Sequence, residues 1–474
     1  MSHLANLISR FKPKKKYSSP SGAFNITVDG IMVGLPEDFV NEDGSVKVPI
    51  ENFLQDISVL RSAWVSAGTD LKRVEEKNQG LINFLRRDRH VSPSETVVRL
   101  RISCPVPFAI PLFHLFCSVN EQSGRYGEIS TEFFQPPPGL DESASELYAE
   151  AFTTSKRYYA RALSLGCANE QARFFLCSGF YTAFYFLISL RELQDFLSQE
   201  ANYRNIYTQS HSDEFCEIFG LFHDIMKDLF PWSYEAYERF PHTTDFKRLV
   251  QTVSKLPEPI ISNSLWGKGG IDLLETYGND ELMLDAWERA YDDPRKALGL
   301  GGRIYRLTCP IHTYRQWVRH RSCHNSLQTI DFDHIVQSQL FYEPSQWTTQ
   351  KGKIGAYVYA PAEENIQAEL KDMLTRFTDE MSEIYQSLSF GSNSQLASLV
   401  LPYTYFVSAL RNETYLGASN FDSLRRDSHA QSDIRIGAEV MALWWEHSHP
   451  GTFAKHMSEL YYGDQGWPGV DQQT

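Results

Sequence analysis

The segments VRLRISCP (residues 98–105) and RIYRLTCP (residues 303–310) organise this sequence. Each places apolar residues among polar ones, as a half-buried β-strand does, and each ends at a Cys-Pro step. The apolar members are Val98, Leu100 and Ile102 in the first segment and Ile304 and Leu307 in the second. Because one pattern occurs twice, internal repetition is the first hypothesis to follow along the chain.

The same kinds of landmark follow both Cys-Pro steps in the same order. An aromatic residue and a proline come first, in Phe134–Pro136 and Tyr342–Pro344. Apolar residues at helical spacing then predict a long amphipathic helix in each half. These residues are Leu147, Ala151, Tyr158 and Ala162, and then Ile366, Leu370, Met373, Phe377, Met381, Ile384 and Leu388.

The two helices and the two halves are also expected to end alike. Glycine adopts the left-handed C-cap conformation at little cost, so Gly166 and Gly391 are the predicted helix ends. Pro231–Tyr234 closes the first half and Pro450–Phe453 closes the second. The landmarks favour duplication over chance.

The predicted fold class is α+β, with two tandem units that each have a sheet covered by helices and together form a pseudodimer. A flexible basic tail is expected over 1–22, the N-terminal unit over 23–242 and the C-terminal unit over 243–474. The boundary is placed where Pro241 begins a polar stretch.

Composition restricts the possible partners. The 474 residues carry a formal charge of −14, which disfavours broad binding to nucleic acid or to an anionic membrane. Seven cysteines without a CxxC pair indicate neither a zinc ribbon nor a complete disulfide framework, and no secretory signal is apparent, so a cytoplasmic protein is expected. The longest uncharged run, residues 174–190, is interpreted as a buried core helix rather than a membrane span.

Two dense polar segments carry the candidate chemistry, NEQSGRY (120–126) and RQWVRHR (315–321). Arginine presents a permanent charge with planar paired donors, so Arg125, Arg173 and Arg319 suit a nucleotide phosphate. Taken singly, Arg125 and Arg319 would more often be solvated surface arginines, and the Ser-Gly-Arg-Tyr context reverses that interpretation. His320 and His324 have helical i,i+4 spacing, but no acidic partner follows, so no metal site is predicted.

At these segments the sequence resembles the flavin-dependent thymidylate synthases, whose signature joins Arg-Gln-Trp-x-Arg-His-Arg to Asn-Glu-x-Ser-Gly-Arg-Tyr. Here the first half retains only the second part, and the second half retains only the first part. The resemblance extends over roughly residues 55–240 and 275–460. Its weaker strings, in chain order, are residues 62–66, 90–95, 170–173, 189–193 and 424–431.

The resemblance implies roles for particular residues. Arg425 is the catalytic candidate, because it resembles the family arginine at the N3–C4 edge of the pyrimidine. The substrate-binding candidates are Gln316, Trp317, Val318, Arg319, Glu121, Gln122, Ser123, Gly124, Arg125 and Arg173. The flavin-binding candidates are Ser92, Arg319, His320, Arg321, Glu121, Ser189, Leu190, Arg191 and His429.

The implied reaction is the reductive methylation of dUMP to dTMP by an FAD-dependent methyltransferase. FAD, NADPH and 5,10-methylenetetrahydrofolate are the expected cofactors, and dUMP and the folate are the expected small-molecule partners. Because the signature is divided between the halves, the retained residues are expected to form one composite site. The resemblance also implies a homodimer of pseudodimers.

Two other functions stay open on the sequence. The protein could be a flavin-dependent enzyme that alkylates C5 of another pyrimidine nucleotide. It could also be a catalytically silent scaffold, because each half taken alone lacks part of the signature.

Overall fold

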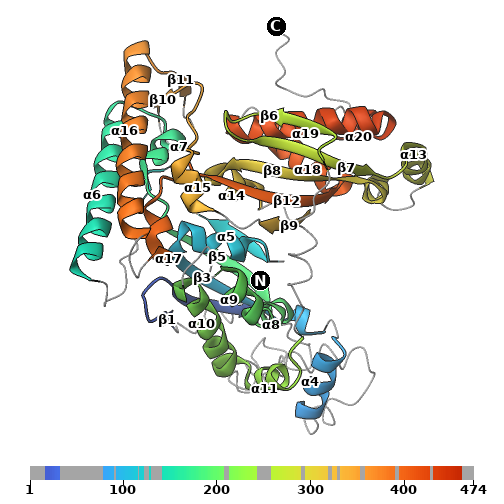
Figure 1. Cartoon of the computed structure of the whole chain (residues 1–474). Helices are drawn as coiled ribbons and strands as arrows, with labels where there is room; N and C mark the ends of the chain where they lie inside the picture. Colours follow the sequence, from blue (N-terminus) through green and yellow to red (C-terminus); the bar gives the residue numbers. More distant parts are fainter. Residues whose placement is uncertain are drawn as a thin grey trace.

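The computed structural model describes residues 16–32, 78–89, 92–115, 117–121, 127–129, 141–207, 213–242, 258–289, 294–318, 323–327, 331–352, 358–389, 394–426 and 431–461. Two five-stranded antiparallel sheets dominate it (Figure 1). The first has the order β1-β2-β3-β5-β4, and the second has the order β6-β7-β8-β12-β9.

The strands of the first sheet are β1 Lys16–Ser18, β2 Asn25–Met32, β3 Val97–Pro105, β4 Ser118–Glu121 and β5 Tyr181–Ser189. Those of the second are β6 Ile261–Ser264, β7 Gly270–Tyr277, β8 Gly302–Pro310, β9 Cys323–Leu327 and β12 Phe406–Thr414. A separate hairpin joins β10 Thr348–Lys351 to β11 Val358–Pro361.

The two sheets agree in register as well as in order. Pro105 pairs with Tyr181 between β3 and β5, and Pro310 pairs with Phe406 between β8 and β12. The pairing shifts by one residue opposite Leu100 in the first sheet and opposite Tyr305 in the second. Leu100 and Tyr305 hold the same place in their strands, so both sheets carry the same irregularity.

Helices follow the strands in matching order. The helical elements of the first half are α4 Asn78–Arg87, η3 Ser92–Glu95, α5 Val106–Phe113, α6 Glu142–Ser164, α7 Asn169–Ala172, η4 Arg173–Phe175, α8 Leu190–Leu197, α9 Glu200–Tyr207, α10 Asp213–Leu229 and α11 Pro231–Arg239. Those of the second half are α13 Asp280–Arg289, η5 Pro294–Leu300, α14 Ile311–Trp317, α15 Phe332–Gln337, α16 Glu364–Ser389, α17 Ser394–Ala397, η6 Ser398–Val400, α18 Tyr415–Arg425, α19 Ser432–Ser448 and α20 Pro450–Tyr461.

The long helices α6 and α16 confirm the predicted amphipathic pair, and they lie side by side at one edge of the molecule (Figure 1). Their apolar faces meet, with the rings of Tyr158 and Phe377 5.3 Å apart. Gly166 follows α6 with φ of 78°, as the glycine stop predicts. Gly391 lies outside the described residues.

The two halves meet through corresponding segments, one from each half. Cys177 follows η4 and Pro402 follows η6, and these two residues form a β-bridge with each other. Around it, the Ser178 N–H donates to Leu401 O at 2.7 Å and the Tyr403 N–H donates to Leu176 O at 2.8 Å. Because the two bonds are reciprocal, this contact is self-complementary, as in a two-fold interface.

Residues 174–190 do not form the expected buried helix. The run contains η4 and then β5, whose two neighbours in the sheet are β3 and β4. Aromatic and β-branched residues fill β5, and they favour a pleated strand over a helix. Length alone could not distinguish these alternatives. No helix in the described part of the chain is long and apolar enough to span a membrane.

The inward row of β8 differs from the apolar members chosen in the sequence. Arg303, Tyr305 and Leu307 are fully buried, whereas Ile304 lies on the other face and is half-buried. Arg303 pairs with Glu413 of β12, Nη2 to Oε2 2.8 Å, and donates to Met441 O at 2.5 Å. A buried arginine is tolerated here because its charge and donors are satisfied.

The predicted tail over 1–22 is too long. Lys16–Ser18 pair with β2 as strand β1, and the Tyr17 hydroxyl donates to Asp228 at 2.8 Å. The Ser21 N–H donates to Glu217 at 3.2 Å. Residues 16–22 therefore belong to the fold, and residues 1–15 lie outside the described part.

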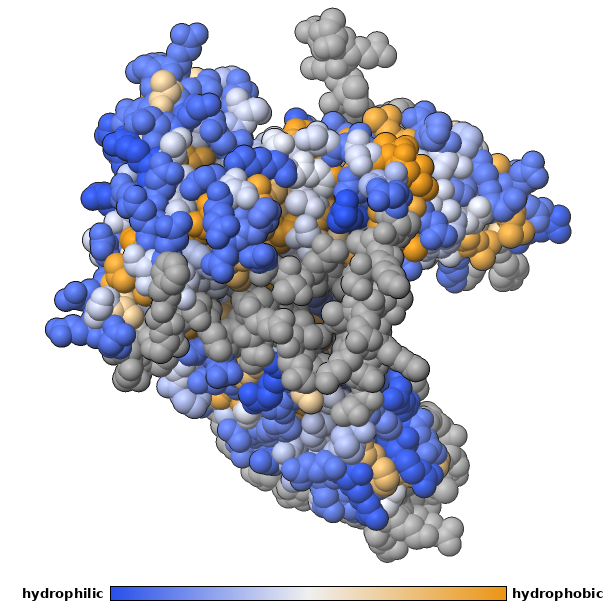
Figure 2. Space-filling view, in the orientation of Figure 1, coloured by the Kyte–Doolittle hydropathy of each residue, from blue (hydrophilic) through white to orange (hydrophobic). Residues whose placement is uncertain are grey.

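Apolar side chains gather over α19 and α20 on the face shown in Figure 2. On α19, Ile436 is 39% exposed and Leu443 is 61% exposed. The largest buried cluster runs through both halves and includes Phe175, Trp347 and Phe377, and a second cluster in the second half includes Met283, Trp287 and Trp445.

The contact between the halves predicts the effect of a substitution at Gly179. Its N–H donates to Leu399 O at 2.7 Å, and an added Cβ would lie 2.9 Å from that oxygen and 3.2 Å from the Leu399 Cβ. Gly179→Ala is therefore expected to lower the free energy of unfolding by about 1–3 kcal/mol, measured by denaturant titration. At Gly220 in α10 nothing lies within 4 Å of an added Cβ, so Gly220→Ala should raise stability slightly. Equal losses in both variants would contradict this account of the contact.

Candidate active site

Two of the retained motifs meet between the halves. Glu121 is the last residue of β4, and Arg315 lies in α14, directly after β8. The Arg315 guanidinium forms an ion pair with the Glu121 carboxylate, and both side chains are buried. A strand end of the first half is thus joined to a helix of the second half through opposite charges, the arrangement that a buried charge requires.

Other polar groups complete this cluster. The Thr182 hydroxyl donates to Glu121 Oε1 and accepts from Arg315 Nη2 at 3.0 Å. Arg315 Nη1 donates to the Tyr403 hydroxyl at 2.9 Å, and the guanidinium lies 5.8 Å from the centre of the Phe113 ring. The orientation of Arg315 is therefore determined by both halves.

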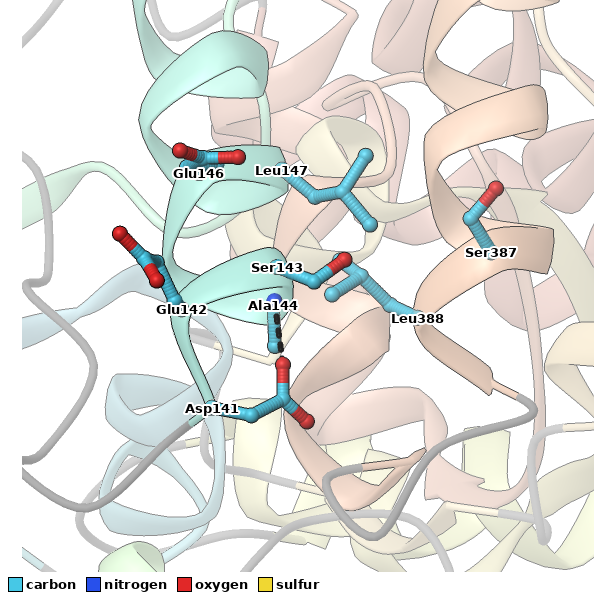
Figure 3. A pocket seen from close by; sticks show the side chains of 8 residues that line it. All are labelled: Asp141, Glu142, Ser143, Ala144, Glu146, Leu147, Ser387 and Leu388. Atoms are coloured by element: carbon cyan, nitrogen blue, oxygen red, sulfur yellow. Dashed lines mark hydrogen bonds between the residues drawn. The ribbon is translucent and has the colours of Figure 1, made fainter.

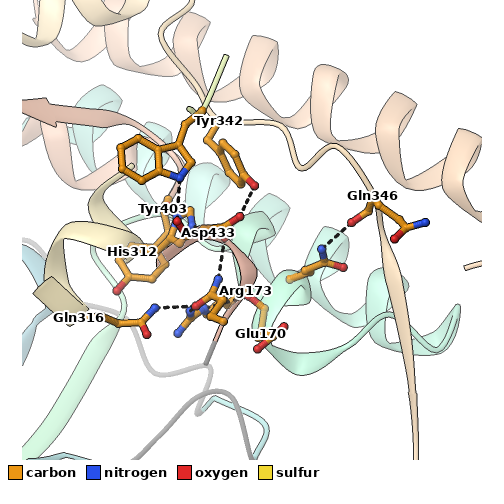
Figure 4. A network of polar contacts seen from close by, with 11 residues as sticks. Glu170, Arg173, His312, Gln316, Tyr342, Gln346, Tyr403 and Asp433 are labelled. Atoms are coloured by element: carbon orange, nitrogen blue, oxygen red, sulfur yellow. Dashed lines mark hydrogen bonds and ion pairs between the residues drawn. The ribbon is translucent and has the colours of Figure 1, made fainter. Parts of the chain in front are cut away.

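A second cluster joins Arg173 to Gln316 (Figure 4). Arg173 begins η4, is 8% exposed, and donates from Nε to Glu170 O at 3.0 Å. Its Nη2 donates to Gln431 Oε1 at 2.8 Å, and Gln316 Nε2 donates to the same oxygen at 2.6 Å. Gln431 is the N-cap residue of α19, so residues from η4, α14 and α19 meet at one amide.

Asp433 lies behind that amide. Its carboxylate accepts hydrogen bonds from Gln431 Nε2 at 2.9 Å, from His312 Nε2 at 3.2 Å and from the Tyr342 hydroxyl. Burial alone would raise the pKa of the Asp433 carboxyl, but these donors and His312 hold it below its usual value. Burial lowers the pKa of His312, so we take the imidazole as neutral beside an ionised Asp433.

Among the described residues, the charged members of these clusters occur in one of the two equivalent locations. At the corresponding positions of the other half, Ile110 stands for Arg315 and Ser398 stands for Arg173, while Val407 stands for Thr182. All three are buried, at 3%, 6% and 3% exposure. The equivalent location is therefore largely apolar.

The structure brings together three of the predicted substrate-binding residues, Glu121, Arg173 and Gln316, around these two clusters. The side chains of Trp317 and Val318, two more substrate-binding candidates, are buried in the core. The Trp317 indole stacks 4.7 Å from Phe421 and donates to the Tyr305 hydroxyl at 3.2 Å. Only the main chain of these two residues could face a ligand.

The predicted flavin residues of β5 and α8 lie farther away. Ser189 ends β5 and caps α8, accepting from the Glu192 N–H at 3.2 Å, and Leu190 is fully buried. The Arg191 Nε lies 3.8 Å from Asp195 Oδ2. Seven residues of extended strand separate Ser189 from Thr182, roughly 23 Å, so these two sets lie at opposite ends of β5.

Arg425 ends α18 and is half-buried. The Ser92 side chain and the remaining candidates lie outside what the structure describes. Those remaining candidates are Gln122, Ser123, Gly124, Arg125, Arg319, His320, Arg321 and His429.

Sequence reasoning missed the partners of the motif residues. Thr182, Tyr403, His312 and Asp433 have no assigned role in the signature, although Asp433 follows the matched string 424–431 by two residues. A carboxylate in the first turn of a helix was the only signal available for it. Within the described ranges, no group of three or more His, Cys, Asp or Glu side chains has a metal-binding arrangement.

A separate pocket of about 630 Å³ lies between the start of α6 and the end of α16 (Figure 3). Its acidic lining includes Asp141, Glu142 and Glu146, and Asp141 accepts from the Ala144 N–H at 2.8 Å to cap α6. The lining repels a phosphate, so the Arg173 cluster is the better candidate for an anionic ligand.

Comparisons with known proteins agree with the repeated sheets. Residues 53–231 and 304–450 match the family described as thymidylate synthase complementing protein. The flavin-dependent thymidylate synthase of Thermotoga neapolitana is 32% identical over 205 residues, which cover 41% of this chain and 91% of that protein. The enzyme of Pseudothermotoga lettingae is 32% identical over 224 residues, covering 44% of this chain and 97% of that protein.

Among solved structures, the UMP/dUMP methylase PolB of Streptomyces cacaoi, bound with 5-Br dUMP, aligns with a TM-score of 0.36 and 20% identity. The alignment covers 46% of this chain and 96% of PolB. The family matches span more than half of the sequence and fall on both repeated sheets. The chain therefore belongs to the flavin-dependent thymidylate synthase family.

Proposed function

We propose that this protein is a flavin-dependent thymidylate synthase that converts dUMP to dTMP at one composite site between its halves. One observation carries the proposal: Glu121 and Arg173 of the first half lie against Arg315 and Gln316 of the second half. Each half supplies the motif that the other lacks.

In this proposal Arg173 binds the phosphate of dUMP together with the segment Glu121–Arg125. A dianionic phosphate suits a guanidinium, which donates two parallel hydrogen bonds. Gln316 contacts the same nucleotide from the second half, and Arg319 adds a further charge. The buried partners of Arg173 and Gln316 hold both side chains in place before the nucleotide enters, which reduces the entropy lost on binding.

The residues at the end of β5 fit an anionic dinucleotide such as FAD. Ser189 offers a hydroxyl and Arg191 a guanidinium at the start of α8, where the helix dipole also favours negative charge. Ser92, His429 and Arg319–Arg321 would complete this flavin site. FAD reduced by NADPH supplies the hydride, and 5,10-methylenetetrahydrofolate supplies the carbon.

Arg425 is the proposed catalytic residue. A cation at the N3–C4 edge of uracil stabilises the negative charge that develops there, and it thereby raises the electron density at C5. Arg425 ends α18 and is half-buried, and the family resemblance is what assigns it this role.

We further propose that residues 23–242 and 243–474 are tandem copies that form a pseudodimer about the Cys177–Pro402 bridge. Two such chains would make a homodimer of pseudodimers, and the exposed Ile436 and Leu443 of α19 support a contact of this kind.

The decisive experiment uses the purified full chain. Its absorption spectrum is recorded, and it is then incubated with dUMP, NADPH and methylenetetrahydrofolate while dTMP is measured. A flavin spectrum with dTMP formation is the expected result. Bound flavin without turnover of dUMP would favour a different pyrimidine nucleotide, and the same assay with UMP and dCMP tests that. Absence of both flavin and nucleotide binding would favour a scaffold.

Substitutions should distinguish the composite site, where they are expected to lower activity, from the equivalent location, where they are expected to have little effect. Arg125→Ala, Arg173→Ala and Arg425→Ala are each expected to lower kcat/KM for dUMP at least ~100-fold, because a phosphate or a developing anion loses its donor. Ser398→Ala is the matched control for Arg173→Ala. His114 follows α5 nine residues after Pro105, as Arg319 follows α14 nine residues after Pro310, so His114→Ala tests the place where the first half lacks the arginine motif. Both should retain nearly full activity. Loss of activity in these two, with Arg125→Ala active, would contradict the composite site.

FAD stoichiometry provides an independent prediction. The second location has Leu416 in place of Arg191 and residues 113–115 in place of the arginine motif, so it offers too little positive charge for a flavin diphosphate. One FAD per chain is therefore expected after extraction and quantification against protein concentration. Two FAD per chain would show that the apolar location also binds flavin.

A further inference from the structure

The amide of Gln431 connects the two sides of the proposed nucleotide site, because Arg173 and Gln316 both donate to it. Its side chain is 1% exposed, and its oxygen accepts from Arg173 Nη2 at 2.8 Å and from Gln316 Nε2 at 2.6 Å. Arginine has donors only, so the amide oxygen of Gln431 has to point toward it. The amide nitrogen then points toward Asp433, 2.9 Å away.

Asp433 determines that orientation. An ionised carboxylate only accepts hydrogen bonds, and Asp433 accepts from Gln431, from His312 and from the Tyr342 hydroxyl. Its own main-chain oxygen accepts from the Trp266 indole at 3.0 Å, which anchors the start of α19. Reversal of the Gln431 amide would place its nitrogen against two donors and its oxygen against a carboxylate.

This arrangement is absent from the other half. Pro107 occupies the position of His312 and is buried there. Proline has no side-chain donor, so it cannot reproduce the contact of His312 with Asp433. Among the residues described at this position, the histidine donor occurs on the side that has Arg173.

We propose that Gln431, oriented by Asp433, is a positioning residue that holds Arg173 and Gln316 together in the geometry that receives the nucleotide. The inference rests on the proposed function. In this inference Gln431 acts through Arg173 and Gln316, and it does not contact the reacting atoms.

A purely structural role gives a different expectation. If the cluster served only to anchor α19, then weakening any of its bonds would lower thermal stability and leave nucleotide affinity unchanged. The positioning role instead predicts that the loss of the Gln431 amide changes nucleotide affinity more than it changes kcat, because Arg173 and Gln316 bind the nucleotide away from C5.

The first variant removes the hydrogen bonds and keeps the side-chain size. Gln431→Met is expected to raise KM for dUMP, and its Kd measured by calorimetry, at least ~10-fold, since two bonds that orient the binding groups are lost. The kcat at saturating dUMP should fall less than KM rises. Tyr342→Phe is the matched control, because it removes one donor to Asp433 and leaves both bonds to the Gln431 oxygen.

The second variant exchanges the amide and the acid. In Gln431→Glu/Asp433→Asn, the carboxylate at 431 accepts from Arg173 and Gln316, and the amide nitrogen at 433 donates to that carboxylate. His312 can then accept from the same amide while its Nδ1–H faces Tyr403 O, 3.3 Å away. This double variant should bind dUMP with a Kd within about three-fold of the original, a difference smaller than one hydrogen bond's net contribution.

The outcomes separate the two proposals. A folded Gln431→Met with unchanged KM and Kd would overturn the positioning role, and so would a double variant that is 10-fold weaker or more. If Gln431→Met does not fold, which circular dichroism reports, the double variant alone decides. Failure of the unmodified chain to bind dUMP, UMP or dCMP would instead overturn the proposed function, and the positioning role with it.

Discussion

The reciprocal contact of Cys177 with Pro402 is the constraint on which the arrangement of the site depends. It lies between η4 and β5 in one half and between η6 and β12 in the other, so it sets where β5 and β12 begin. Arg173 lies four residues before the bridge, and Thr182 lies five residues after it. Both residues are thereby placed against the second half, where Arg315 and Gln431 contact them.

A self-complementary contact creates two equivalent locations, yet the polar groups occupy one. An unused buried charge costs several kcal/mol, whereas apolar residues of suitable shape fill the same space favourably. Ile110 and Val407 at the second location are consistent with that difference. If duplication released one location from selection for ligand binding, exchange of its charged residues for apolar ones would also have stabilised the fold.

The second sheet buries more charged side chains than the first sheet does, although the apolar location described above is the one without charged groups. Arg303 and Glu413 form a fully buried pair where the first sheet has Val98 and Ile188. Arg411 donates to the Tyr305 hydroxyl at 2.9 Å, and the same hydroxyl accepts from Trp317. These contacts hold α14 against its sheet, which sets the direction in which Arg315 and Gln316 point.

The sequence by itself determined the repeat, the long helices α6 and α16, the family and the identity of most motif residues, because these depend on local order and spacing. It misjudged residues 174–190 and the inward row of β8, where pairing across strands decides burial. Only the tertiary structure decided that Arg315 meets Glu121 and that Gln431 joins Arg173 to Gln316. These partners are between 115 and 258 residues apart along the chain, and two of the three pairs join different halves. Such contacts leave no periodic signal in the sequence, because they arise when two folded units close on each other.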